Sequence, residues 1–179
     1  MNKIRYFSAV LITALAASPV VSAGDSLIYG NVSSWTVHTD PEHSYRCFTE
    51  VRYEGGTSIR IGYNTTAGDL YLSVSDASWG RMSPGSEQDM TISFDDTAQR
   101  QIAGNGIAMG ARGESAAVSL AIPGQSRQSF LRDFMARHTM TVSIASAEAI
   151  DLSLAGSHRA ALMLEECQVA MARVAARTE

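Results

Sequence analysis

Short segments that alternate apolar and polar residues recur along the chain and constrain its fold more than any other feature. Such alternation is the pattern of a β-strand with one buried face. Turn-forming residues interrupt it about every eight to twelve residues, which is typical of antiparallel β-structure. The pattern predicts about eight or nine short strands in an antiparallel β-sandwich or open barrel. The expected strands cover residues 35–37, 46–54, 57–63, 70–74, 90–94, 107–109, 118–122, 140–144 and 150–154.

Two later segments change from the strand period to the helical period. Within residues 126–138 the apolar residues lie three and four apart, and Ser126 is the expected N-cap. A second helix is expected from about His158 toward Arg173, after a turn at Gly156-Ser157. We therefore predict a mainly β fold with two helices, the last at the C-terminus, packed on one face or edge of the β-structure.

Residues 1–23 have the features of a secretory signal peptide. Lys3 and Arg5 form a short basic start, and residues 6–17 form an apolar core that is shorter than the ~20 residues of a transmembrane helix. Small residues at the end of the segment predict cleavage between Ala23 and Gly24. We expect one exported β-rich domain, residues 24–179, in the periplasm or secreted. No later apolar run in the sequence is long enough for a transmembrane helix.

The chain has two cysteines, Cys47 and Cys167, which lie 120 residues apart. In an exported protein an isolated pair of cysteines indicates a disulfide, whereas the alternative is two free buried thiols. Cys47 belongs to the more apolar face of its expected strand, and Cys167 belongs to the apolar face of the C-terminal helix. We therefore predict the disulfide Cys47–Cys167, buried in the core.

The charge of the mature chain limits its partners. Because Lys3 and Arg5 precede the expected cleavage site, 12 of the 14 basic residues remain against 18 acidic residues, a net charge of −6. An acidic chain without a basic cluster argues against nucleic acid and anionic membranes as partners. The glycines at 104 and 106 lack the preceding strand and following helix of a dinucleotide fingerprint, and we predict no cofactor.

Residues His38, Asp40 and His43 form the densest cluster of potential metal ligands. Two imidazoles and a carboxylate bind a divalent ion when a turn brings them together. Their spacing matches no specific ligand motif, so an exposed polar turn is the favoured alternative. The three residues are kept as weak candidates for a metal site.

Ser157 and His158 bring a hydroxyl and an imidazole together in sequence. Nucleophilic catalysis requires such groups to meet in space, with a third group that orients the base. Adjacent residues seldom reach that geometry, and Ser157 is interpreted as a helix N-cap. The carboxylates of Asp95 and Asp96 follow an alternating strand and are interpreted as solvated turn charges. We therefore predict no catalytic residue.

These features together resemble a known family. A signal peptide is followed by Trp35-x-Val37, by Cys47 soon after, and by an all-β middle region. A Phe130-x-x-x-Phe134 helix, a strand pair and the Gly156-Ser157 turn complete the pattern. This is similar to the small exported bacterial proteins of the invasion-associated locus B type. The resemblance implies a periplasmic or secreted β-sandwich without established catalytic residues, with a role at the envelope or in host interaction.

Three functional hypotheses follow. The first is a non-enzymatic binding or protein-interaction module in the periplasm or outside the cell, whose partner is another protein or an envelope component. The second is a periplasmic protease inhibitor of the small β-barrel kind, which would use its N-terminal segment or a loop as a plug. The third is a metal-dependent hydrolase that uses His38, Asp40 and His43.

Overall fold

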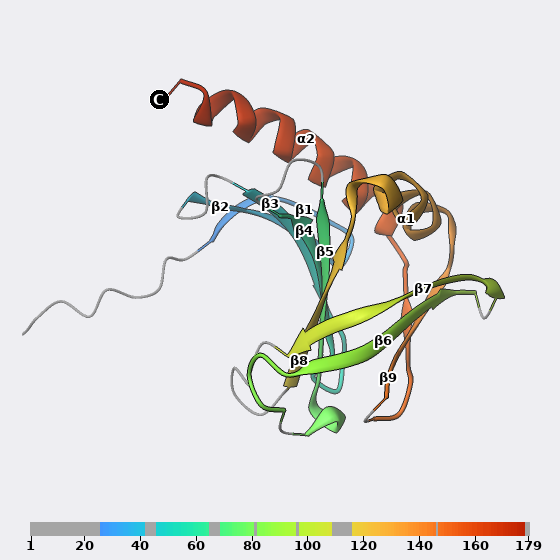
Figure 1. Ribbon diagram of the computed structural model, residues 1–179. Helices are drawn as coiled ribbons and strands as arrows, with labels where there is room; N and C mark the ends of the chain where they lie inside the picture. Colours follow the sequence, from blue (N-terminus) through green and yellow to red (C-terminus); the bar gives the residue numbers. More distant parts are fainter. Residues whose placement is uncertain are drawn as a thin grey trace, which may run out of the picture.

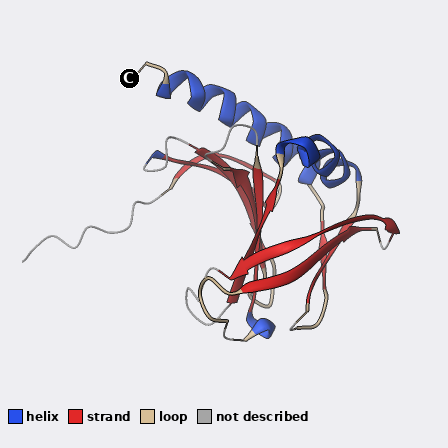
Figure 2. Cartoon of the chain, in the orientation of Figure 1, coloured by secondary structure: helices blue, strands red, loops and turns tan. Residues whose placement is uncertain are grey.

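The computed structural model describes residues 26–41, 46–64, 69–80, 82–95, 97–108, 116–145 and 147–177. The expected signal peptide, with Ala23 and Gly24, lies outside these residues. The described part of the chain is mainly β, as predicted, with ten strands and two α-helices (Figure 2). The strands are β1 (Leu27–Val32), β2 (Trp35–Asp40), β3 (Arg46–Arg52), β4 (Ser58–Tyr63), β5 (Leu70–Asp76), β6 (Glu87–Phe94), β7 (Thr97–Ala108), β8 (Ala116–Ile122), β9 (Thr139–Ile144) and β10 (Ile150–Ser153).

All ten strands belong to one antiparallel sheet that does not close into a barrel. Their order across the sheet is β1-β2-β3-β4-β5-β8-β7-β6-β9-β10. The long strand β7 pairs with β6 along most of its length but meets β8 only at Ile107 and Ala108. The sheet turns at this short contact, so that β6 and β7 run across the direction of β5 and β8 (Figure 1). The strands β1 and β10 are left as the two edges.

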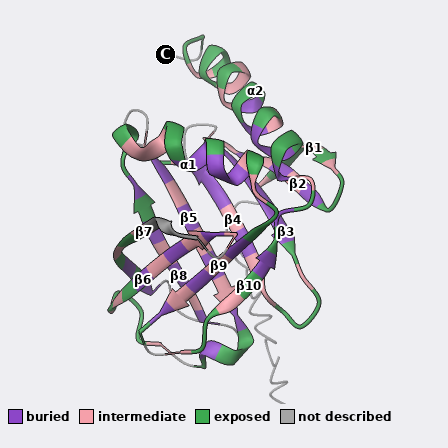
Figure 3. Cartoon of the chain, turned by 90° about the vertical axis from the view of Figure 1, so that its right-hand side faces the viewer, coloured by how far each residue is buried: buried purple, intermediate pink, exposed green. Residues whose placement is uncertain are grey.

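The two helices lie together at one end of the sheet (Figure 2). Helix α1 (Gly124–Ala136) contacts β8, and helix α2 (Ser157–Ala175) contacts α1 and strands β1, β2 and β3. The buried residues of α2 end at Cys167, and its last turns extend beyond the sheet with mostly exposed side chains (Figure 3). Among the described residues, no helix combines the length and apolar character needed to cross a membrane.

The core lies on one face of the sheet, between its two halves and under the helices. Strand alternation supplies it with aliphatic side chains, and α1 adds Phe130 and Phe134. Cys47 and Cys167 are fully buried there and form a disulfide, which joins β3 to α2 as the sequence predicts. Hence α2 covers the Cys47 face of β3 and leaves the opposite face uncovered by either helix.

The structure corrects several expectations. Residues 27–32 lie outside the expected strands but form β1, and the strand expected around Ile107 and Ala108 already begins at Thr97, as the twelve-residue β7. Helix α1 begins at Gly124 without a side-chain cap, so Ser126 is not its N-cap. The N-cap of α2 is Gly156, whose φ of 86° lies in the left-handed region that favours glycine.

Candidate functional site

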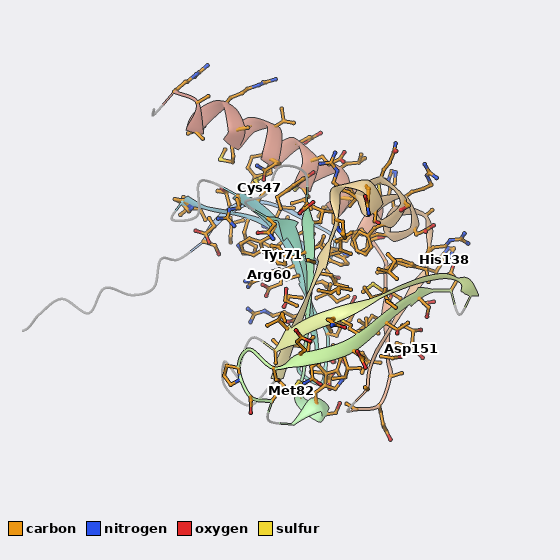
Figure 4. The ribbon with its side chains drawn as sticks, viewed as in Figure 1. Cys47, Arg60, Tyr71, Met82, His138 and Asp151 are labelled. Carbon is orange, nitrogen blue, oxygen red and sulfur yellow. A yellow bond between two sulfur atoms is a disulfide. The ribbon has the colours of Figure 1, made fainter. Side chains whose placement is uncertain are left out.

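The uncovered face of strands β2 to β5 carries a cluster of aromatic and charged side chains. We call His38 of β2, Phe48 and Glu50 of β3, Arg60 of β4 and Tyr71 of β5 the outer-face cluster. Strand register brings them together, because His38 pairs with Phe48, and Glu50 pairs with Arg60. Arg60 and Tyr71 lie side by side on the side of the sheet that faces away from β6 and β9 (Figure 4).

Phe48 is the centre of the cluster. The ring of His38 stacks on the ring of Phe48, with centroids 4.8 Å apart and planes 11° from parallel. The guanidinium carbon of Arg60 lies 4.4 Å from the Phe48 centroid, in cation–π geometry. These neighbours leave Phe48 only 6% exposed, although it points away from the core. The outer face therefore contains a small packed layer of its own.

Gly62 makes this layer possible by bringing the strand backbone close to the rings. It pairs with Phe48 on one side and with Tyr71 on the other. A Cβ atom at Gly62 would lie 2.6 Å from Phe48 Cβ and 2.7 Å from both Cε1 and the hydroxyl oxygen of Tyr71. Carbon atoms in contact are normally about 3.5–4.0 Å apart. The Tyr71 ring therefore occupies the space that a side chain at residue 62 would need.

Two guanidinium groups converge on the carboxylate of Glu50. Arg52 donates from Nε to Oε1 at 2.6 Å, and Arg60 donates from Nη2 and Nε to Oε2 at 2.6 and 3.1 Å. Burial alone would raise the pKa of Glu50, but the hydrogen bonds from both arginines outweigh it and hold the pKa below its ordinary value. Glu50 is thus an anion at neutral pH, and the three groups together carry one excess positive charge.

The other ionisable groups of the cluster are neutral at neutral pH. Burial lowers the pKa of His38, so that its imidazole is mainly uncharged at pH 7. Burial raises the pKa of Tyr71 to about 12, so that its hydroxyl stays protonated. No nucleophile with an adjacent base occurs among these five side chains. The cluster is suited to binding an anionic or planar group, because it presents arginine and aromatic surface side by side.

The structure describes two of the three candidate metal ligands. His38 and Asp40 lie on the same face of β2, and His43 lies outside the described residues. The His38 ring is instead engaged by Phe48, and its Nδ1 lies 3.4 Å from the Ser26 hydroxyl. Within the described ranges, no group of three or more His, Cys, Asp or Glu side chains is arranged to hold a metal ion.

Ser157 and His158 also have separate environments. The buried Ser157 hydroxyl donates to the carbonyl oxygen of Phe134 at 2.6 Å and so links the start of α2 to the end of α1. His158 is exposed. Ser157 therefore has a structural role, although it is the first residue of the helix and not its N-cap as predicted.

Asp95 is a structural residue of the turn after β6. Its Oδ1 accepts hydrogen bonds from the backbone N–H groups of His138 and Thr139, each at 3.0 Å. These bonds, with a smaller contribution from Arg137, hold the pKa of Asp95 below its ordinary value. The carboxylate ties the β6–β7 turn to the start of β9, which the sequence interpretation as a solvated charge did not foresee. Asp96 lies outside the described residues.

A hollow of about 600 Å³ is lined by residues of α1 and by Glu165 of α2. Its lining combines the apolar side chains of Leu131 and Met135 with both signs of charge and with amide groups. This mixture defines no single ligand chemistry. The residues that line the hollow are Gly124, Gln125, Arg127, Gln128, Leu131, Arg132, Met135 and Glu165.

Comparison with known proteins supports the fold. No family model and no curated protein matches the chain. Among solved structures, the chain resembles the crystal structure of invasion associated protein B from Bartonella henselae, with a TM-score of 0.56. The match covers 81% of this chain and 99% of that chain at 10% sequence identity. The chain therefore shares the fold of that protein, which agrees with the family resemblance seen in the sequence.

Of the outer-face cluster, the sequence pointed only to His38, as a candidate metal ligand. A usable signal is present in the sequence of β3 and β4, where Phe48 interrupts an otherwise polar face and Gly62 follows in the next strand. A large ring opposite a glycine in paired strands indicates close packing on that face.

Proposed function

We propose that this protein is an exported, non-enzymatic binding module whose outer-face cluster contacts another protein or an envelope component. The observation that carries the proposal is the arrangement around Glu50, where two arginines share one buried carboxylate beside a stacked aromatic pair. Arginine and aromatic side chains are enriched in the energetically important part of protein interfaces. The fold shared with invasion associated protein B is consistent with an envelope or host-interaction role.

The charge of the cluster indicates what the partner presents. The whole chain is acidic, with a net charge of −4, yet the group of Arg52, Arg60 and Glu50 carries one excess positive charge. The Arg52 side chain is 81% exposed, so its guanidinium reaches solvent while Glu50 holds it in place through Nε. A partner surface with carboxylate groups complements this arrangement, because guanidinium binds carboxylate with two parallel hydrogen bonds.

Export supports a partner outside the cytoplasm. The buried disulfide between Cys47 and Cys167 belongs to an oxidising compartment. Residues 1–23 are proposed as a signal peptide, and residues 24–179 as a single exported domain. Periplasmic and secreted locations both fit these features.

The test compares two exposed arginines on different surfaces. Arg52→Gln removes the excess positive charge of the group formed by Arg52, Glu50 and Arg60, and Arg159→Gln makes the same change at an exposed position of α2. Variants whose melting temperature equals that of the native protein are then used to capture proteins from envelope extracts at low and high salt. We expect at least one envelope protein to be captured by the native chain and by R159Q, and to be captured in a smaller amount by R52Q. Equal retention by both variants would contradict the proposed binding face.

The two alternative hypotheses gain no specific support. Residues 27–32 form strand β1, so most of the N-terminal segment that an inhibitor would use as a plug is part of the sheet. The metal-dependent hydrolase has no assembled ligand group in the described part of the chain.

A further inference from the structure

The two edges of the sheet meet solvent in different ways. Each of β1 and β10 has a strand neighbour on one side only. A free edge presents unpaired N–H and C=O groups, and proteins protect such edges with short strands, charges or bulges. Strand β10 has four residues and carries the exposed charge of Asp151. This edge is protected against pairing with another strand.

Strand β1 lacks most of this protection. It exposes Leu27, Ile28 and Tyr29 to 55%, 64% and 39%, and these are three of the seven large hydrophobic side chains found exposed in the described residues. Residues 26–37 contain no Asp, Glu, Lys or Arg. Among the described residues, the protection of β1 consists of a register shift between Ile28 and Gly30, where the strand departs from regular pairing with β2, and of a contact with helix α2. An uncharged apolar edge of this kind is able to pair with a further strand.

We propose that β1 pairs with β1 of a second copy of this chain, which continues the sheet across a two-fold axis. Every strand pair described in the sheet is antiparallel. A two-fold axis places identical strands antiparallel by symmetry, so self-pairing of β1 repeats the pattern of the whole sheet. When the axis passes beside Ile28, Leu27 of each copy lies opposite Tyr29 of the other and the two Ile28 residues face each other, so the exposed apolar side chains meet.

Charge does not oppose a second copy at this edge, whereas it opposes one at the opposite edge. The chain has a net charge of −4, so contact between two copies is opposed by repulsion wherever acidic residues meet. Self-pairing of β1 brings no charged side chains of the strand together, whereas self-pairing of β10 would bring two copies of Asp151 close to each other. Like charges on directly paired strands destabilise a sheet.

The size of the contact sets its strength. A stable protein interface buries roughly 800 Å² on each partner, and a pair of six-residue strands with a register shift provides less than this. The dimer is therefore concentration-dependent and in exchange with the monomer. The proposal does not rest on the proposed function, because β1 contains none of the five residues of the outer-face cluster.

The test measures mass against concentration for three forms of the exported protein. Analytical ultracentrifugation of the native protein, over roughly a hundredfold range of concentration, is expected to show reversible dimerisation. Ile28→Lys puts a charge at the exposed edge, and Val169→Lys makes a matched change at a 54% exposed position of α2. We expect I28K to remain monomeric and V169K to dimerise like the native protein, with equal melting temperatures.

Hydrogen exchange of the native protein gives a second readout. Backbone amides of residues 27–32 are expected to exchange more slowly as the concentration rises. A native protein that is monomeric throughout the range overturns the proposal, as does a dimer that I28K and V169K affect equally. Slower exchange in β1 only after addition of envelope extract also overturns it, because the edge then pairs with a foreign strand.

Discussion

Replacement of Gly62 by alanine should damage the outer face without touching the core. The new Cβ atom would lie 2.6 Å from Phe48 Cβ and 2.7 Å from the Tyr71 ring and hydroxyl. The end of the Tyr71 side chain can move away, but Phe48 Cβ is fixed by the backbone of β3, which is paired on both sides. Relief of the contact therefore requires a shift of β3 or β4.

The expected cost follows from two opposing effects. Overpacking of a packed site typically costs about 1–3 kcal/mol. Replacement of a strand glycine by alanine recovers about 0.5–1 kcal/mol of backbone entropy. We therefore expect G62A to lower the free energy of unfolding by about 1–2 kcal/mol, with a fall in melting temperature of roughly 2–8 °C for a chain of this size.

The assay is urea denaturation of the disulfide-bonded protein, with Gly104→Ala as the control. A Cβ at Gly104 of β7 would meet only Leu120 Cδ1, at 2.9 Å, a methyl group at the end of a flexible side chain. We expect G104A to lower the free energy of unfolding by less than G62A does, because a leucine methyl group can move more readily than a strand backbone that is paired on both sides. A G62A protein as stable as G104A would show that the backbone is not held between Phe48 and Tyr71 as described.

Three further predictions concern the contacts that hold the fold together. Joint replacement of Cys47 and Cys167 by alanine should lower the free energy of unfolding by about 4–5 kcal/mol, because the disulfide joins residues 120 positions apart and so restricts the unfolded chain. Urea denaturation measures the loss. Ser157→Ala leaves the Phe134 carbonyl without its hydroxyl donor and should cost about 1–2 kcal/mol in the same assay. The pKa of Asp95 is lower in the folded than in the unfolded protein. Its ionised carboxylate therefore adds to the free energy of unfolding above about pH 4, and this stabilisation is lost as the pH falls through the folded pKa. Asp95→Asn should therefore weaken the acid dependence of stability, measured by urea denaturation between about pH 2 and 5.

The strands with one buried face were predictable from sequence. Strands β5 and β9 show strict alternation because every second side chain enters the core. Strand β1 gives no such signal, since it is an edge strand with no fully buried side chain. For strand β7 the alternation predicts only the end, around residues 107–109, because the glycines before it weaken the pattern. In the structure the absence of a side chain at Gly106 leaves room for Val118, whose Cγ1 would lie 2.4 Å from an added Cβ.

The site was less predictable than the fold because its burial is not local. Phe48 and Glu50 alternate outward in sequence, and strand period alone predicts them to be exposed. They become buried through His38, Arg60 and Tyr71, which come from three other strands. The sequence predicts on which face of a strand a residue lies. Whether side chains of other strands bury that residue depends on strand order and register.

The position of α2 explains why both proposals fall on the same half of the molecule. Cys167 and Leu164 occupy the inner face of β1 to β3, and Trp35 Nε1 donates to the Ala155 carbonyl oxygen at 3.0 Å, so this face is closed. The outer face and the β1 edge remain, and register joins them through Ile28, which pairs with His38. A dimer through β1 would therefore set two outer-face clusters side by side in one surface. Two linked sites raise the apparent affinity for a partner that presents repeated epitopes. Ile28→Lys should then weaken binding to a multivalent partner and spare a monovalent one, whereas Arg52→Gln should weaken both.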